Sequence, residues 1–380
     1  MRQRLVTLSL LMASLYGLEG TSQADHPTDE TSTPTSVVAP VVKCTDEKPC
    51  DKEKPCDKKK PCDKEKPSDK EKPSGKLLVG AWLSPDDGLT LGAGAMNHRF
   101  FSGDHSVRVS ATLASRRQEL ALKYKVPRLL GSGLALEAEL HDRQVAYEGF
   151  SRRHTGGSAR LSRALGSGVG MYLGYRNDEA SALILGRKTE DLTQSGIVAS
   201  LRAGLTYETP GSGGRHVRSE LFVERSSPWL GSEYDFVSAG ANANLRQPLI
   251  GPLVLDLSGS VQALASESSF GLPLAERLQH EGHADVRGFG IGNVGGPTGG
   301  TLKALGRAEL QFPLVSSWGL SGALFYDAGL LRDETRSSLA QSVGGSLIVK
   351  TPVGPLRVDF ALPLGDAARP QLLLGLGGSF

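Results

Sequence analysis

The sequence predicts an all-β chain: a 16-stranded antiparallel transmembrane β-barrel preceded by a disordered low-complexity segment. From Leu77 to the end, segments of about ten residues alternate apolar with polar or small side chains, which is the period of a β-strand. Gly, Pro, Asp and Ser clusters separate these segments, as expected of turns. No uninterrupted apolar run reaches the roughly 18 residues that a membrane helix needs.

Residues 1–24 are expected to be a secretory signal peptide. Arg2 and Arg4 give a positively charged start, residues 5–18 form a mostly apolar core, and residues 22–24 (Ser-Gln-Ala) offer small side chains before a cleavage site. An N-terminal membrane anchor is the alternative, although this apolar core is short for a bilayer span. The mature chain would begin near Asp25.

Residues 25–76 are expected to form a disordered tether rich in Lys, Asp, Glu, Pro and Cys. The hexapeptide at 51–56 recurs at 57–62 and 63–68, and its opposite charges and prolines leave nothing to bury. Zinc ligands usually come in pairs two to four residues apart, whereas the cysteines here recur every six residues. We therefore interpret them as products of repeat duplication, with metal binding as the alternative, and expect no cofactor. The four cysteines are Cys44, Cys50, Cys56 and Cys62.

Residues 77–380 are expected to form the barrel, and the alternation supplies an even number of strands, as single-chain bacterial barrels have. On strand 253–264, for example, Leu255, Leu257 and Val261 alternate with Asp256, Ser258 and Ser260. The expected strands are 77–85, 88–98, 105–115, 118–127, 133–144, 153–164, 168–177, 195–208, 215–225, 234–248, 253–264, 301–313, 317–328, 342–351, 355–363 and 371–380.

Period alone leaves open which face meets water. A soluble periplasmic sandwich would bury its apolar face, whereas a membrane barrel would turn that face to lipid. Three features favour the barrel: the signal peptide, strands of about ten residues, and an apolar face of Leu, Val, Ala and Gly. The connections also alternate between short turns and longer loops, which are 178–194, 226–233, 265–300 and 329–341.

The longest connection, 265–300, carries Val286-Arg287-Gly288-Phe289 in a glycine-rich tract, and Phe325-x-Asp327-x-Gly329 follows in a later strand. A loop of this length is usually functional or disordered. Together with the final strands, these motifs resemble the barrel of the outer membrane protein 85 superfamily, the bacterial surface antigens. The resemblance implies a loop that folds back into the lumen and a buried arginine at its tip.

A buried arginine needs an acidic partner, because an unpaired buried charge is costly. Alternation points Asp327 and Glu309 inward, and the resemblance also places acidic residues at both positions. We therefore expect Arg287 to pair with both by bidentate hydrogen bonds. The alternative is an exposed Arg287 and an Asp327 that merely lines a wet channel. We name the expected group the loop lock: Val286, Arg287, Gly288, Phe289, Glu309 and Asp327, with Phe325 and Gly329 as its strand motif.

The end of the chain supports the same resemblance. Residues 353–364 resemble the family's penultimate strand. Residues 372–380 alternate and end in Phe380, like a barrel-insertion signal that includes Gly375. Gly378 stands where a second apolar residue is usual. Glycines in this strand offer few cross-strand contacts, which is compatible with a weak seam between the first and last strands.

The expected function is gated passage or membrane insertion of another molecule through a lumen plugged by residues 265–300. Members of the family that insert or secrete proteins carry periplasmic POTRA repeats before the barrel, and residues 25–76 are too short and too polar to fold as one. We therefore expect a member lacking that module. The alternatives are a client-free transport pore or structural surface antigen, and a soluble periplasmic sandwich.

The expected location is the bacterial outer membrane, with the tether in the periplasm. The expected partners are outer-membrane lipid, a client protein or lipid, and the barrel-assembly machinery that inserts the chain itself. A formal net charge of +2 gives no field for nucleic acid. Serine-hydrolase, P-loop and metal-ligand spacings are missing from the sequence, so no enzyme activity is expected. His280 and His283 are expected to be solvated.

Overall fold

The structure is a computed structural model that describes residues 75–84, 88–100, 105–147, 149–184, 192–209, 214–266, 272–296, 298–352, 354–365 and 369–377. The expected signal peptide, nearly all of the expected tether with its four cysteines, and Phe380 lie outside the described residues. Gly75 and Lys76, expected at the end of the tether, instead begin the first strand.

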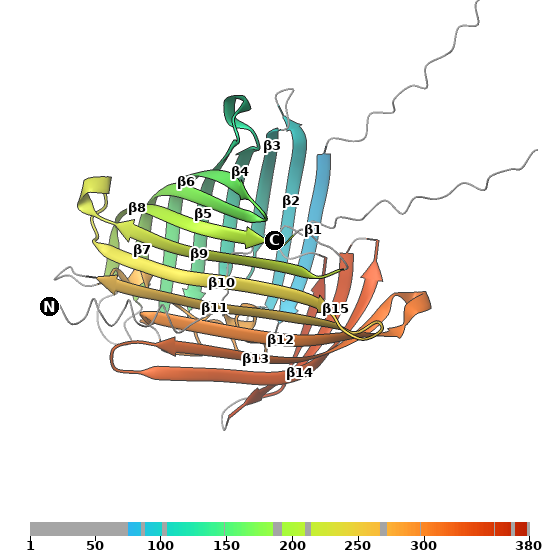
Figure 1. Cartoon of the computed structure of the whole chain (residues 1–380). Coiled ribbons are helices and arrows are strands. Elements are labelled where there is room, and N and C mark those ends of the chain that lie inside the picture. The colour runs from blue at the N-terminus through green and yellow to red at the C-terminus, as the bar shows by residue number, and fades with distance from the viewer. Residues whose placement is uncertain are drawn as a thin grey trace, which may run out of the picture. The chain divides into compact units, whose positions relative to one another are not determined.

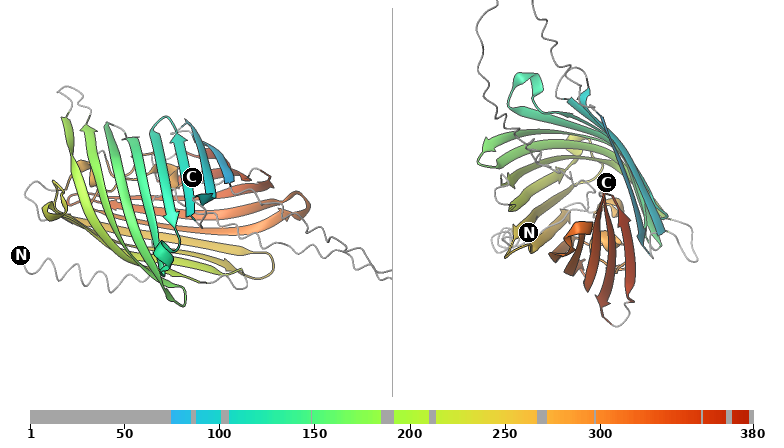
Figure 2. Two further views of the ribbon diagram at one scale, coloured as in Figure 1. Left: turned by 90° about the horizontal axis from the view of Figure 1, so that it is seen from above. Right: turned by 90° about the vertical axis from the view of Figure 1, so that its right-hand side faces the viewer.

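All sixteen expected segments form strands, and each pairs antiparallel with its neighbours in the chain. β1 closes the ring by pairing with β16 (Figures 1 and 2). The strands are β1 (Gly75–Ser84), β2 (Gly88–Phe100), β3 (His105–Leu113), β4 (Arg117–Val126), β5 (Leu134–Tyr147), β6 (Phe150–Gly166), β7 (Val169–Ile184), β8 (Leu192–Glu208), β9 (His216–Ser226), β10 (Phe236–Pro248), β11 (Val254–Ser266), β12 (Leu302–Val315), β13 (Leu320–Arg332), β14 (Ser337–Thr351), β15 (Gly354–Leu364) and β16 (Gln371–Leu376).

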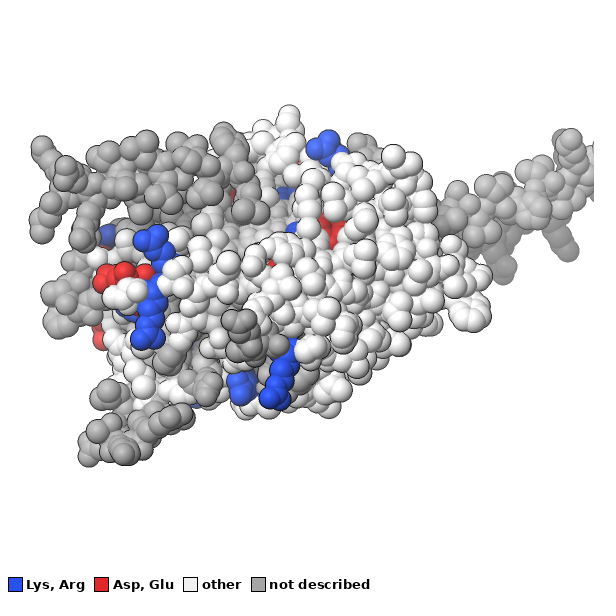
Figure 3. Space-filling view, turned by 90° about the horizontal axis from the view of Figure 1, so that it is seen from below, with Lys and Arg blue, Asp and Glu red and all other residues white. Residues whose placement is uncertain are grey.

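Large exposed apolar side chains cover the outside of the wall, and the buried charged side chains point into its interior. β13 lies between β12 and β14. Its Leu324 and Tyr326 are 58% and 40% exposed, while its Asp327 is fully buried. The surface in Figure 3 accordingly carries few charged side chains. A soluble sandwich would show the opposite arrangement, so that alternative is wrong. In the described part of the chain, no helix is long and apolar enough to cross a membrane.

Several strands run further than predicted, and β3, β10 and β16 are shorter. β7 continues to Ile184 rather than ending at 177, because Asp178 faces the interior and its charge does not end the strand. β14 begins at Ser337 instead of 342. β16 spans Gln371–Leu376, and Gly377 follows it with a positive φ of 87° while donating its N–H to the carbonyl of Pro355 in β15.

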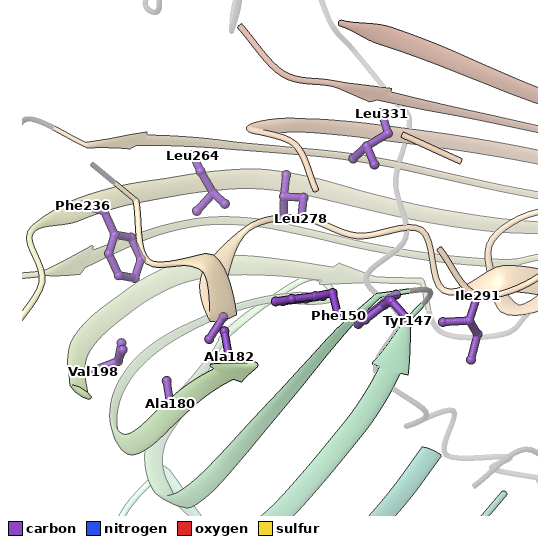
Figure 4. Packing of buried hydrophobic residues seen from close by; sticks show 11 residues of the cluster. Tyr147, Phe150, Ala180, Ala182, Val198, Phe236, Leu264, Leu278, Ile291 and Leu331 are labelled. Atoms are coloured by element: carbon purple, nitrogen blue, oxygen red, sulfur yellow. The ribbon is translucent and has the colours of Figure 1, made fainter. Parts of the chain in front are cut away.

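An apolar cluster inside the barrel fixes the segment between β11 and β12. Ala275, Leu278 and Ile291 from this segment pack against inward-facing residues of the wall, which include Tyr147 and Phe150 (Figure 4). Ile291 is fully buried. A large apolar side chain buried in this way contributes roughly 1.5–3 kcal/mol. The remaining wall members are Ala180, Ala182, Val198, Phe236, Leu264 and Leu331.

Candidate functional site

The segment between β11 and β12, which we call the lumen loop (described residues 272–296 and 298–301), folds back on itself. Leu278 and Gly300 exchange backbone hydrogen bonds of 3.0 and 2.8 Å, and Gly292 donates to the carbonyl of His280. Two short 3-10 helices, η3 (Leu274–Glu276) and η4 (Gly282–Ala284), lie along it. The tip that follows η4 carries Arg287 to the inner face of β12 and β13.

Arg287 binds two acidic residues of the wall. Its Nε and Nη2 donate to the two oxygens of Asp327 at 2.7 Å each, and its backbone N–H donates to the same carboxylate at 3.1 Å. Its Nη1 donates to Glu309 at 2.8 Å. Burial alone would lower the pKa of Arg287, but Asp327 and Glu309 raise it above its ordinary value. The structure therefore brings Arg287, Asp327 and Glu309 together, with Arg287 charged.

The Phe-x-Asp-x-Gly motif supplies three consecutive inward positions of β13, because alternate residues of a strand share one face. Phe325 lies under the guanidinium of Arg287, whose carbon is 3.5 Å from the ring centre. Asp327 binds Arg287 as described above. Gly329 leaves room for Val286, since a Cβ at Gly329 would lie 2.8 Å from Val286 Cγ2. One face of β13 thus contacts the loop tip in three ways. Phe325 stacks on Arg287, Asp327 binds its charge, and Gly329 leaves space for Val286.

The other loop-lock residues contact neighbouring strands. Val286 is fully buried and packs with Ala340 of β14 and with Phe289. Phe289 also meets the ring of His280 edge-on. Gly288 has a φ of +89°, and a Cβ there would lie 2.7 Å from Pro363 of β15. Both the left-handed conformation and this close approach require glycine.

Glu309 has a second arginine partner that sequence reasoning missed. Arg357 of β15 donates to both oxygens of Glu309, at 3.0 and 2.6 Å, and its Nε donates to the buried Asp359. Glu309 therefore lies between two guanidiniums, one from the loop and one from the wall. The alternation within residues 353–364 could have identified Arg357, because it places Arg357 and Asp359 on the same face of the strand.

Basic residues of β12 hold the backbone just before Arg287. Arg307 donates to the carbonyl oxygens of His283, Ala284 and Asp285. Lys303 lies 2.7 Å from the carboxylate of Asp285. Burial would raise the pKa of Asp285, but Lys303 lowers it below its ordinary value. This part of the loop is thus fixed to the same strand that presents Glu309.

Glu281 ties the loop to the opposite side of the wall. It accepts hydrogen bonds from Tyr147 at the end of β5 (2.8 Å), Arg152 of β6 (2.5 Å) and Arg117 of β4 (2.8 Å). Burial would raise the pKa of Glu281, but Arg152 and Arg117 lower it below 4.5. This buried acid was not predicted, because a residue in an irregular loop has no periodicity from which to infer its neighbours.

Glu276 adds a further attachment on that side. Arg176 of β7 donates to its two oxygens at 3.1 and 3.0 Å. Burial would raise the pKa of Glu276, but Arg176 lowers it. The lumen loop is therefore held by ion pairs to β4, β6 and β7 as well as to β12 and β13.

The two loop histidines are not solvated as expected. His280 is 1% exposed, and neither of its ring nitrogens has a hydrogen-bond partner among the described residues. Burial lowers the pKa of His280 to about 4 and, with Arg117 and Arg307, does the same for His283. The expectation failed because the loop enters the barrel interior, which buries His280 and half-buries His283.

His283 also links the loop to the closing pair of strands. Its ring stacks on Trp82 of β1, with ring centres 5.7 Å apart and planes 17° apart. Trp82 in turn covers Gly375 of β16, where a Cβ would overlap its ring. Gly375, predicted as part of an insertion signal, therefore accommodates a tryptophan that touches the lumen loop. Phe380 lies outside the described residues.

A polar cavity of about 390 Å³ remains beside the lumen loop. It is lined from the loop by Glu276 and Glu281 and from the wall by charged residues of β4 to β9, among them Arg160, Arg202 and Glu224. Within the described ranges, no group of three or more His, Cys, Asp or Glu could hold a metal ion.

A closed 16-stranded ring with an apolar outer face, a charged interior and a loop folded into it defines a β-barrel membrane protein. A family model described as the Omp85 superfamily domain matches residues 100–380. The chain belongs to the Omp85 superfamily, whose barrels reside in the outer membrane.

Solved structures with this fold include BamA from Haemophilus ducreyi lacking POTRA domains 1–3, which is 16% identical with a TM-score of 0.66. That match covers 80% of this chain and 70% of BamA. CdiB from Escherichia coli is 15% identical with a TM-score of 0.57, covering 79% of this chain and 62% of CdiB. CdiB from Acinetobacter baumannii is 13% identical with a TM-score of 0.57, covering 80% and 59%. The chain thus spans about three fifths of either CdiB chain.

Proposed function

We propose that this outer-membrane barrel gates the passage or membrane insertion of another molecule, with the lumen loop as its plug and the loop lock as the device that holds the plug. One observation carries the proposal. The tip of the lumen loop brings the charged side chain of Arg287 into hydrogen bonds with Asp327 and Glu309 inside the barrel. A loop of this kind could instead lie in water outside the wall. Membership of the Omp85 superfamily supports the same assignment.

The lateral opening is proposed at the junction of β1 and β16. Within the described ranges, which end at residue 377, β1 pairs with β2 along its whole length, Gly75–Ser84, and with β16 from Ala81 to Leu83 alone. A short ladder has few hydrogen bonds to break, and Gly375 brings no side chain to it. Because Trp82 of this junction stacks on His283, movement of the loop would change the packing of the seam.

Cysteine pairs across the strands test the lateral opening, in a background in which Cys44, Cys50, Cys56 and Cys62 are replaced by serine. Leu83→Cys with Leu374→Cys bridges the seam, and Leu83→Cys with Leu89→Cys bridges the fully paired β1 and β2. We expect oxidation of the seam pair to abolish function in cells and oxidation of the β1–β2 pair to leave it intact. Equal behaviour of the two pairs would exclude a lateral gate.

Clients are sought by depleting the protein in its source bacterium and measuring the outer-membrane proteome and lipid composition. Loss of specific proteins or lipids, restored by the wild-type chain but not by the oxidised seam pair, identifies what the barrel inserts or exports. An unchanged outer membrane would contradict the insertion function.

A client-free transport pore or structural surface antigen is the second candidate. The polar cavity of about 390 Å³ beside the lumen loop favours the pore, because charged walls can conduct ions and small solutes. Under this alternative, depletion changes solute uptake without changing the outer-membrane proteome. Neither candidate function is enzymatic, and the N-terminal tether is proposed to lie in the periplasm.

A further inference from the structure

A second pair of arginines lies on the lumen wall, away from the loop lock. Arg160 of β6 and Arg202 of β8 both line the polar cavity. Each is paired in register with Gly174 of β7, so the three residues form one row across adjacent strands. Gly174 leaves the space between the arginines open, since a Cβ there would meet nothing closer than 3.5 Å.

Aromatic rings hold both guanidiniums in place. The guanidinium carbon of Arg160 lies 3.5 Å from the centre of the Tyr172 ring, and that of Arg202 lies 3.6 Å from the centre of the Phe222 ring. Each ring lies over a glycine of the next strand, Gly204 or Gly240, where a Cβ would come within 2.6 Å of it. Stacking uses the flat face of a guanidinium and leaves its in-plane N–H donors free.

Among the described residues, these donors form no hydrogen bond, and their one ion pair is a long one from Arg202 to Glu224. Within the described part of the chain, Arg160 makes no hydrogen bond or ion pair. The acid nearest to Arg202 is Glu224 at 3.9 Å, and the buried Nε of Arg202 has no hydrogen-bond partner. Glu224 already accepts from Ser200 and Arg176. Arg287 differs from these two arginines, because Asp327 and Glu309 balance its charge.

Of the other acids nearby, Glu137 of β5 is in register with Arg160 but forms no ion pair with it among the described residues, and Glu220 is already engaged. Glu220 accepts hydrogen bonds from the hydroxyl of Tyr172 and from Asn242. Two strand spacings separate the backbones of Arg160 and Arg202 by about 10 Å, a distance over which two long side chains can approach one anion. Arg160, Gly174 and Arg202 all line the same polar cavity, so both side chains face its interior.

We propose that Arg160 and Arg202 form a binding site for a small oxyanion of the phosphate class, seated over Gly174. Phosphate oxygens match the fork of N–H donors that each guanidinium presents, and they would supply the acceptors that the wall lacks. This site goes beyond the proposed gating function and does not depend on it, because it requires neither movement of the loop nor a client.

Calorimetric titration of the purified full chain with inorganic phosphate, in a maltoside detergent without phosphate groups, tests the site. We expect saturable binding, weakened about tenfold or more by Arg160→Gln or Arg202→Gln and lost in the double variant. Arg163→Gln, on the exposed outer face of the same strand, should bind like the wild type. Absence of saturable binding, or equal binding to the double variant, overturns the proposal.

A second pair of variants keeps both arginines and so does not depend on how well the double variant folds. Gly174→Asp places a carboxylate between the two guanidiniums and should abolish phosphate binding, whereas Gly174→Ala should preserve it. Equal binding to these two variants overturns the site. A parallel titration with glycerol 3-phosphate distinguishes the source of the anion: tighter binding indicates a lipid-headgroup fragment, and weaker binding indicates free phosphate.

Discussion

Asp327 accepts both a bidentate pair of bonds from the Arg287 side chain and a third from the Arg287 backbone N–H, and it is fully buried while doing so. A carboxylate in that position is stable only when its charge is matched. The position of the loop tip and the matching of this buried charge therefore depend on the same contact.

Removing Arg287 should release the loop. Arg287→Ala leaves Asp327 buried without its cation, which costs roughly 3–5 kcal/mol. Arg287→Lys should be intermediate, because a single ammonium cannot reproduce the two-point bond. The measurement is the rate of limited proteolysis within the lumen loop, expected to increase in the order wild type, Lys, Ala.

Arg153 provides the matched control for this series. It forms the same bidentate geometry with Asp142, at 2.8 and 2.7 Å, but the two side chains are 53% and 40% exposed. An exposed pair contributes only about 0–1 kcal/mol. Arg153→Gln should therefore leave proteolysis unchanged, and an effect equal to that of Arg287→Ala would mean that general charge loss, not the buried contact, fixes the loop.

Adjacent glycines of β14 test the stacking surface under Arg287. A Cβ on Gly344 would overlap the Phe325 ring and the backbone of Phe360, whereas a Cβ on Gly345 meets nothing closer than 3.6 Å. Gly344→Ala should lower the free energy of unfolding by roughly 1–3 kcal/mol through overpacking. Gly345→Ala should be close to neutral. Heat-dependent gel mobility measures both, and equal transition temperatures would contradict this account of Phe325.

Acidification should loosen the lumen loop between about pH 6.5 and pH 4. In the docked loop, burial lowers the pKa of His280 from 6.5 to about 4, so the released loop binds a proton more readily. The contribution of His280 to docking of the loop is complete above pH 6.5 and falls by roughly 3 kcal/mol by pH 4, and His283, whose pKa is also lowered to about 4, acts in the same direction. The lowered pKa of Glu281 acts only below its ordinary value of 4.5, outside most of this window.

The matched variant for the pH series is His280→Leu. An apolar side chain costs no hydrogen bond here, since neither ring nitrogen of His280 has a partner among the described residues. Proteolysis of the loop in this variant should depend less on pH than in the wild type. His216→Gln, which alters a histidine on β9 far from the loop tip, should not change the dependence, and a pH profile unaffected by His280→Leu would refute the prediction.

The seam offers a test through its glycine. Gly375→Val should displace Trp82 from β16 and from its stack on His283, because a Cβ at that position overlaps the indole ring. We expect slower disulfide formation between Leu83→Cys and Leu374→Cys in this variant, and unchanged formation between Leu83→Cys and Leu89→Cys. An unchanged rate at the seam would mean that Trp82 does not order the junction.

Alternation in the sequence was sufficient to place Asp327 and Glu309 on the inner face, since a strand has only two faces. It could also have identified Arg357, which shares a face with Asp359. It could not identify Glu281 or the burial of His280, because these depend on the path of an irregular loop through the barrel. Strand ends were least predictable where charged residues such as Asp178 face the lumen and continue the ladder.

The central claim is that the contact of Arg287 with Asp327 and Glu309 holds a plug inside the barrel. Single-channel recordings in planar bilayers compare the wild type, Arg287→Ala and Arg153→Gln. We expect a mostly closed wild type, a closed Arg153→Gln and long-lived large openings in Arg287→Ala. Conductance that is the same in all three proteins would contradict it.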